Sequence, residues 1–262
     1  MLRDLDRKEV WLLLLLALIS FYLPLSLAPL FDLDEGAFSE ATREMLTGKD
    51  YITTYLNGDL RFDKPILIYW LQLLSVKLFG LHEFALRLPS AIAGTLWVAV
   101  TYLFSRRFLG RDVAFYAALF MLSALQINLI AKAAIADGLL NLFIAVTMFG
   151  IYLYYTTEKR RYLYAAFLFM ALGFLTKGPV AILIPFVVSL LFFSLRGRFR
   201  LWLKTAFDPI GLLLFAVVAL PWYLLEYQAQ GMAFIDGFFL KHNLHRFDTS
   251  MERHSGGWYY YL

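Results

Sequence analysis

Three carboxylates lie within four residues, at Asp32, Asp34 and Glu35, directly after a long apolar segment. Like charges this close to one another, at the border of a medium of low dielectric constant, cannot all ionise freely. A carboxylate poised in this way is suited to general base catalysis. The structural alternative is that Asp34 caps a following helix by accepting hydrogen bonds from its free N–H groups.

A second candidate is the sequence Asp63-Lys64-Pro65. The ammonium group of Lys64 would offer a compact positive charge to a lipid phosphate at headgroup depth. The alternative is an ordinary exposed ion pair between Asp63 and Lys64, which contributes little to stability.

Asp137 and Lys177 border further apolar segments. Ionisable residues in or at a membrane are costly and mark functional sites. Two structural alternatives remain open: Asp137 is the N-cap of a helix, and Lys177 extends its ammonium group to the membrane surface.

Near the end of the chain, His242 and His245 are spaced to share a helix face. They have no acidic neighbour at metal-ligand spacing, so this spacing is a weak indication of zinc. The chain contains no cysteine, which excludes disulfides, thiolate catalysis and cysteine-ligated metals. It also lacks a Gly-x-Ser-x-Gly sequence and a glycine-rich phosphate loop.

The composition places these residues in a membrane protein. The chain has 262 residues, of which 61% are hydrophobic and 17% charged, and its mean hydropathy is +0.64. A soluble domain is about 45–50% apolar and about 25% charged. We therefore predict an all-α polytopic membrane protein. The net charge of +4 does not indicate nucleic acid as a partner once the basic residues are placed.

Seven apolar segments approach the length of about 20 residues that a membrane crossing requires. They are Val10–Phe31, Glu83–Ser105, Val113–Ala131, Gly138–Thr156, Tyr162–Thr176, Pro179–Leu195 and Pro209–Tyr227. The first is too long for the core of a signal peptide, about 7–15 residues, so we expect it to be retained.

Four basic clusters set the expected orientation: Arg3/Arg7/Lys8, Arg106/Arg107/Arg111, Lys159/Arg160/Arg161 and Arg196/Arg198/Arg200/Lys204. Cytoplasmic loops carry the excess of Lys and Arg. This predicts that the N-terminus lies on the inner side of the membrane and the candidate site on the outer side. The predicted parts are a first crossing at 1–31, an outer catalytic loop at 32–82, six crossings at 83–227 and a second outer loop at 228–262, which we expect to be truncated before a further crossing.

Two helices are predicted inside the outer loop 32–82. Glu35–Thr47 carries apolar residues on one stripe and charged residues opposite, which is typical of an amphipathic helix lying on a membrane. Pro65–Phe79 is apolar but only fifteen residues long, so we expect it to lie at the interface rather than to span.

The order of these motifs resembles that of the GT-C glycosyltransferases. The closest likeness is to the lipid A 4-amino-4-deoxy-L-arabinose transferases and the dolichyl-phosphate-mannose protein mannosyltransferases. The residues that carry it are Asp34-Glu35-Gly36, Arg43-Glu44-Met45-Leu46, Asn57-Gly58, Asp63-Lys64-Pro65, Tyr69-Trp70, Arg87-Leu88-Pro89-Ser90, Asp137, Thr176-Lys177-Gly178, His242-Asn243 and Arg246-Phe247.

The resemblance implies an inverting glycosyltransferase with a polyprenyl-phosphate sugar donor and a lipid A, glycolipid or protein acceptor. It implies that Asp34 is catalytic, within the pair Asp34-Glu35, and that Asp137 is a second active-site aspartate. Lys64 would contact the donor phosphate, with Lys177 and Arg246 as further basic residues of the cavity. Asp63 and His242 would hold a divalent metal, zinc, in a structural role.

The sequence departs from the aminoarabinose transferases at two points. Ala37, Phe38 and Ser39 stand where those enzymes have Arg-Tyr-Ala, and Ile66 stands where they have a second proline. These differences concern the sugar more than the fold. The alternatives to an enzyme are a secondary transporter and an inactive N-terminal fragment. Transporters place ionisable groups near the bilayer midplane within repeated halves, whereas the apolar segments here are nearly free of charge in their middles.

Overall fold

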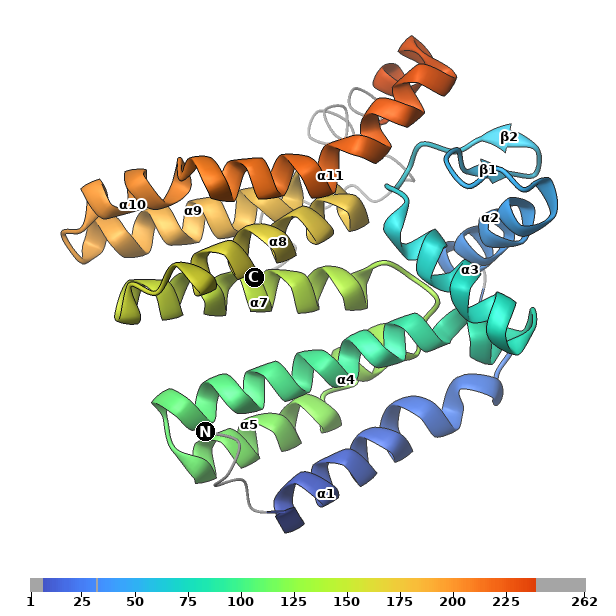
Figure 1. Cartoon of the computed structure of the whole chain (residues 1–262). Coiled ribbons are helices and arrows are strands. Elements are labelled where there is room, and N and C mark those ends of the chain that lie inside the picture. Colours follow the sequence, from blue (N-terminus) through green and yellow to red (C-terminus); the bar gives the residue numbers. More distant parts are fainter. Residues whose placement is uncertain (1–6, 32, 239–262) are drawn as a thin grey trace, which may run out of the picture.

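The computed structural model describes residues 7–31 and 33–238, and this part of the chain is almost entirely helical (Figure 1). The α-helices are α1 (Arg7–Ala17), α2 (Asp34–Gly48), α3 (Leu67–Phe79), α4 (Glu83–Phe108), α5 (Arg111–Ser123), α6 (Leu125–Lys132), α7 (Asp137–Thr157), α8 (Arg160–Lys177), α9 (Val180–Leu195), α10 (Phe199–Ala206), α11 (Pro209–Gln230) and α12 (Met232–Phe234). Helix α1 continues through the π-helical turn η1 (Leu18–Tyr22) and the 3-10 turn η2 (Leu23–Ser26).

Four helices of the described chain are long and apolar enough to cross a membrane: Arg7–Ser26, α4, α7 and α11. The bent pair α5 and α6 makes a fifth if it is one span. Helix α9 has 16 residues, and α8 carries arginines in its first turn and a lysine in its last. The predicted number of seven crossings therefore stays a prediction.

The third predicted crossing, Val113–Ala131, is divided between two helices, α5 and α6, and whether the pair is one span stays a prediction. The chain bends by 63° between α5 and α6, where Ala124 takes an extended conformation. The side-chain amide of Asn128 donates to the carbonyls of Leu122, at 2.7 Å, and Ala124, at 3.1 Å. These bonds satisfy backbone groups at the break, which would otherwise be costly in an apolar medium.

Both helices predicted in the outer loop are confirmed, as α2 and α3. Helix α2 buries Phe38, Ala41 and Met45. On its other side Glu40 and Arg43 form an exposed ion pair of 2.7 Å. Within each set, successive members are three or four residues apart, which is about one helical turn. The periodicity of the sequence therefore already indicates which face is buried and which is exposed.

Two elements were not predicted. Strands β1 (Tyr55–Leu56) and β2 (Asp59–Leu60) form a small antiparallel hairpin around Asn57 and Gly58, whose φ angles are 56° and 83°. Two successive positive φ angles are typical of the tight hairpin turn that Asn-Gly favours, so the signal was present. Helix α10 lies within the last basic cluster and buries Trp202, whose indole N–H donates to Ser189 at 3.0 Å.

The bundle has two chemically different ends (Figure 1). At one end, here the loop end, α2, the hairpin and α3 lie beside the starts of α4 and α7. The opposite end, here the basic end, holds the turns α4–α5 and α7–α8 and helix α10. Its arginines form ion pairs: Arg111–Glu9 at 2.7 Å, Arg106–Glu9 at 3.8 Å, Arg160–Asp208 at 3.6 Å and Arg198–Glu158 at 3.8 Å.

Candidate functional site

Asp34 is the first residue of α2, and its side chain is exposed. Its neighbour Leu33 has φ 66° and ψ −88°, a region that bulky residues rarely adopt. Among the residues that the structure describes, no hydrogen bond or ion pair holds the Asp34 carboxylate. Leu33, not Asp34, is the N-cap, so the capping alternative was wrong.

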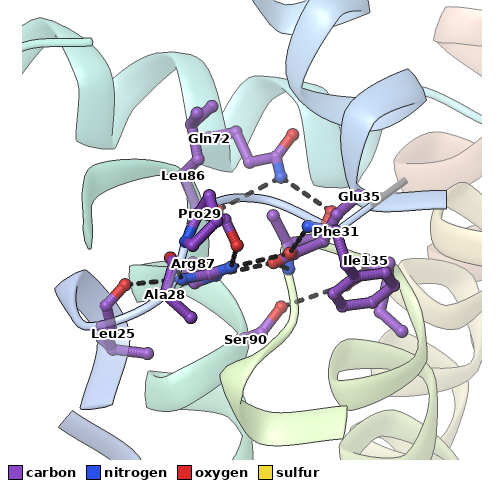
Figure 2. A network of polar contacts seen from close by, with 11 residues as sticks. Leu25, Ala28, Pro29, Phe31, Glu35, Gln72, Leu86, Arg87, Ser90 and Ile135 are labelled. Atoms are coloured by element: carbon purple, nitrogen blue, oxygen red, sulfur yellow. Dashed lines mark hydrogen bonds and ion pairs between the residues drawn. The ribbon is translucent and has the colours of Figure 1, made fainter. Parts of the chain in front are cut away.

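Glu35 lies in the opposite environment, with its side chain fully buried. Its two oxygens accept bidentate hydrogen bonds from Arg87 of α4, at 2.7 and 2.8 Å (Figure 2). The backbone N–H groups of Phe31, at 3.0 Å, and Ala134, at 2.7 Å, complete its acceptor sites. A buried carboxylate is stable only with such a set of partners.

Arg87 is satisfied to the same degree. Besides Glu35, its guanidinium donates to the carbonyls of Leu25 at 2.8 Å, Ala28 at 2.8 Å and Pro29 at 2.9 Å (Figure 2). All five N–H donors of the guanidinium are therefore used. The single pair Glu35–Arg87 joins the end of the first span, α2, α4 and the loop before α7.

The loop before α7 is fixed by two further side chains. Gln72 of α3 donates to the carbonyl of Ala134, and Ser90 of α4 donates to the carbonyl of Ile135, at 3.2 and 3.0 Å (Figure 2). Gln72 accepts in turn from Thr42 of α2 at 2.7 Å. The start of α7, and with it Asp137, is thereby held in register with α2.

Asp137 and Lys177 meet at the loop end. Their carboxylate and ammonium groups are 2.6 Å apart, although 40 residues separate them in the chain. Asp137 is the first helical residue, after the N-cap Ala136, so its predicted role as an N-cap was wrong. Lys177 keeps 27% of its side chain exposed and Asp137 keeps 36%, so the pair remains open to a ligand.

Asp63 and Lys64 belong to a small charged cluster with Arg61. The Asp63 carboxylate accepts from Lys64 at 2.7 Å and from Arg61 at 3.2 Å. Arg61 also donates to the hydroxyl of Tyr69 at 3.3 Å, and burial raises the pKa of Tyr69 to about 12. Tyr69 therefore stays a neutral acceptor, and the cluster keeps a net positive charge beside the start of α3.

A common hydrophobic core lies beneath both charged groups. It includes Phe38, Ile66, Tyr69, Ala136, Leu139, Leu175, Tyr223, Phe234 and Phe238. Three of these residues are close to the candidates in the sequence. Ile66 follows Lys64 by two positions, Ala136 immediately precedes Asp137, and Leu175 precedes Lys177 by two positions. Lys64, Asp137 and Lys177 therefore belong to segments that pack into the same core.

Gly178 shows how closely the parts of this core approach. It has φ +72°, and a Cβ atom there would lie 2.9 Å from the ring of Phe238. In the same segment Phe234 packs edge-on against Phe62, with ring centroids 5.6 Å apart. The turn that carries Lys177 and the segment that carries Lys64 thus contact one short stretch after α11.

The predicted metal site receives no support from the described residues. Within 7–31 and 33–238, no group of three or more His, Asp or Glu side chains is placed to hold a metal ion. The two Asp63 oxygens face Arg61 and Lys64, and His242 lies outside the described residues, as do Asp32 and Arg246. The zinc site stays a prediction, and no chemical step is derived through it.

Sequence reasoning gave no role to Arg87, Gln72 or Arg61. The signal for Arg87 was available, because a lone arginine inside a predicted crossing is expensive unless it is paired. Its partner was not recognisable, since Glu35 lies 52 positions earlier beside two other carboxylates. Gln72 offered no signal beyond one polar residue in an apolar helix.

A model of the family described as dolichyl-phosphate-mannose-protein mannosyltransferase matches residues 63–224, which is more than half of the chain. The chain belongs to this family. The matched range contains four of the predicted site residues, Asp63, Lys64, Asp137 and Lys177.

Relatives with assigned names point to the same group. An undecaprenyl phosphate-alpha-4-amino-4-deoxy-L-arabinose arabinosyl transferase of Aeromonas salmonicida is 30% identical over 257 residues, which cover 96% of this chain and 46% of that protein. One of the same name from Yersinia enterocolitica is 31% identical over 256 residues, with the same coverage. The chain spans about half the length of these relatives.

The fold agrees with solved structures of ArnT from Cupriavidus metallidurans. The structure bound to undecaprenyl phosphate matches with a TM-score of 0.84 and 25% identity, over 91% of this chain and 45% of that one. The apo structure matches with a TM-score of 0.85 and 25% identity, over 95% and 46%. This family member therefore has the all-α GT-C membrane fold that the sequence predicted.

Proposed function

We propose that the protein is an inverting glycosyltransferase that moves a sugar from a polyprenyl-phosphate donor to a hydroxyl group at the outer side of the membrane. The acceptor is lipid A, another glycolipid or a protein. The observation that carries the proposal is that the exposed carboxylate Asp34 and the cations Lys64 and Lys177 belong to segments that pack into one hydrophobic core, through Phe38, Ile66 and Leu175 respectively. The names of the relatives support it.

Asp34 acts as the general base. It accepts the proton of the acceptor hydroxyl as that oxygen attacks the anomeric carbon of the sugar. The bond between the anomeric carbon and the phosphate oxygen breaks in the same step, which inverts the configuration. Asp34 lies in the first turn of α2, and a helix N-terminus is the positive end of the helix dipole.

Lys64 and Lys177 stabilise the departing polyprenyl phosphate. Negative charge develops on the phosphate as the sugar leaves, and cations fixed in advance lower the barrier for that step. Asp137 holds the Lys177 ammonium at 2.6 Å, and Asp63 holds that of Lys64 at 2.7 Å. Arg246, outside the described residues, is proposed as a third cation.

Glu35 positions the site rather than taking part in the reaction. Its oxygens are occupied by Arg87 and two backbone N–H groups, so it has no acceptor site left for a substrate. It anchors the first turn of α2 and thereby the direction in which the adjacent Asp34 side chain leaves the helix.

We propose that the loop end faces the periplasm and that the N-terminus is cytoplasmic, in a bacterial inner membrane. The arrangement of charge supports this orientation, because the basic end gathers the arginine clusters that favour the cytoplasmic side. The outer loop 32–82 then contains α2, the hairpin and α3, at the depth where a lipid-linked sugar is anchored.

The test is a transfer assay on the full-length protein with a polyprenyl-phosphate-linked sugar, with release of polyprenyl phosphate as the readout. We expect Asp34→Asn to lower turnover by about 100- to 10,000-fold while donor binding is retained. Asp59→Asn, at the exposed hairpin, is the matched control and should keep full turnover. Full activity of Asp34→Asn would remove the assignment.

Lys64→Ala separates the phosphate role from the base. It should weaken donor binding, whereas Lys77→Ala, on the same outer loop but beside Tyr51, should not. The transporter alternative predicts counterflow of substrate without release of polyprenyl phosphate. Release by the full-length protein but not by the 262-residue chain alone would favour the inactive-fragment alternative.

A further inference from the structure

An apolar cavity of about 250 Å³ is lined by residues of α7, α8, α9, α10 and α11. Three hydroxyl groups are among its lining side chains, and each already donates a hydrogen bond to a backbone carbonyl: Thr147 to Ala166, Ser189 to Phe186 and Thr205 to Leu201. The lining therefore has no unsatisfied hydroxyl donor that requires water. Cavities of this kind stay dry and accept apolar ligands.

The size of the cavity suits a stretch of hydrocarbon. An apolar cavity of about 150 Å³ is sufficient for a benzene ring. Its walls include long apolar side chains such as Ile151, Met170 and Phe186. Because the wall helices α7, α8, α9 and α11 are packed side by side along the bundle, a hydrocarbon chain that enters the cavity from one end would run parallel to these helices.

Helix α10 gives the cavity a charged border. Trp202 and Thr205 lie on its buried face and line the cavity. Arg200 and Lys204, four residues apart on the other face, are exposed. Within the described chain, neither cation has an ion pair or hydrogen bond. A short helix therefore presents apolar side chains inward and two available cations outward.

We propose that the cavity binds one acyl chain of an anionic phospholipid, with its phosphate at Arg200 and Lys204. The occupant belongs to the leaflet at the basic end, because α10 and its cations lie there (Figure 1). The charges argue for an anionic headgroup, since each Lys or Arg near a membrane surface attracts anionic lipid. This site is separate from the loop end, and the proposal does not depend on glycosyl transfer.

Native mass spectrometry of the detergent-solubilised full-length protein tests the proposal. The probes are dioleoyl phosphatidylglycerol and dioleoyl phosphatidylcholine, which share their acyl chains and differ in headgroup charge. We expect one phosphatidylglycerol to bind about thirtyfold more tightly than phosphatidylcholine, since each of two cations contributes about 1 kcal/mol. Equal binding of the two lipids would overturn the charge assignment.

Two kinds of variant separate the cavity from the cations. Ala206→Phe fills the cavity and should weaken binding of both lipids at least about tenfold. Met170→Trp should have the same effect and replaces Ala206→Phe in the experiment if that variant does not fold. Ala117→Phe on α5 is the matched control and should bind as wild type. Unchanged phosphatidylglycerol binding in a folded filling variant, or an equal loss in Ala117→Phe, would overturn the proposal.

The double substitution Arg200→Gln/Lys204→Gln should lower phosphatidylglycerol binding to the level of phosphatidylcholine and leave phosphatidylcholine binding unchanged. Arg7→Gln/Lys8→Gln is the control, because α1 begins on the opposite side of the bundle from α10 (Figure 1). A loss of preference in the control pair as large as in the α10 pair would mean that general surface charge, not this site, selects the lipid.

Discussion

Asp34 and Glu35 are adjacent in the sequence and have opposite environments. Successive residues of an α-helix are rotated by about 100° around its axis. The Asp34 side chain is therefore exposed, whereas the Glu35 side chain is fully buried. The Glu35 carboxylate accepts hydrogen bonds from Arg87 and from backbone N–H groups, whereas the Asp34 carboxylate is exposed. One carboxylate of the pair therefore fixes the helix, and the other stays exposed, as the proposed general base requires.

At this scale we predict that Glu35→Gln destabilises the protein strongly. The change leaves the Arg87 guanidinium buried without a counter-charge, which costs about 3–5 kcal/mol. Thermal unfolding of the detergent-solubilised protein measures the effect. Glu40→Gln is the matched control, because it removes the exposed pair with Arg43 and should shift the transition much less. Equal shifts in the two variants would contradict the structural role of Glu35.

Helix α11 acts as a support for the outer loop. Trp222, Glu226 and Gln230 lie four residues apart and therefore on one face. Trp222 donates to the carbonyl of Ile52 at 2.9 Å, and the Thr53 hydroxyl donates to Glu226 at 3.0 Å and accepts from Gln230 at 3.3 Å. This stripe holds the segment that leads through the hairpin to Arg61 and Lys64.

We predict that Thr53→Val loosens this segment. The substitution removes the hydroxyl that bonds to the buried Glu226 and the half-buried Gln230, at a cost of about 1–3 kcal/mol. Hydrogen exchange of residues 50–64 should become faster in consequence. The control is Thr47→Val, whose hydroxyl bonds only to carbonyls of its own helix α2 among the described contacts. Unchanged exchange in Thr53→Val would show that α11 does not hold the loop.

At the scale of the whole molecule, the predicted site and the basic surface lie at opposite ends of the bundle. The segments that carry Asp34, Lys64, Asp137 and Lys177 pack into one core at the loop end, and the arginine ion pairs lie at the basic end. A membrane between the two ends would keep them in different compartments, and the orientation then decides where transfer takes place.

The chain has no cysteine, so single cysteines report the orientation directly. Asp59→Cys at the hairpin should react with a membrane-impermeant maleimide in cells whose inner membrane is intact. Lys159→Cys, in the exposed α7–α8 turn, should react only after the inner membrane is permeabilised. The reverse pattern would invert the proposed topology, and labelling of both positions in intact cells would indicate a leaky preparation or a mixed orientation.

Periodicity and segment length predicted the helical class and the helices α2 and α3 from the sequence alone, because burial against lipid or core imposes those patterns locally. The same is true of the candidates Asp34, Lys64, Asp137 and Lys177, whose residue types at apolar boundaries are unusual. The break at Ala124 and helix α10 were not predicted. The break depends on contacts of Asn128 and helix α10 on contacts of Trp202, and no local pattern specifies these contacts.

Only the tertiary structure decided which charges meet. Lys177 pairs with Asp137 across 40 residues, and Arg87 pairs with Glu35 across 52, because packed helices bring their ends together irrespective of distance along the chain. From residue types alone Asp34 and Glu35 were equivalent, and burial made them different. The sequence by itself determined which chemistry was present, and packing determined which side chains were left available to perform it.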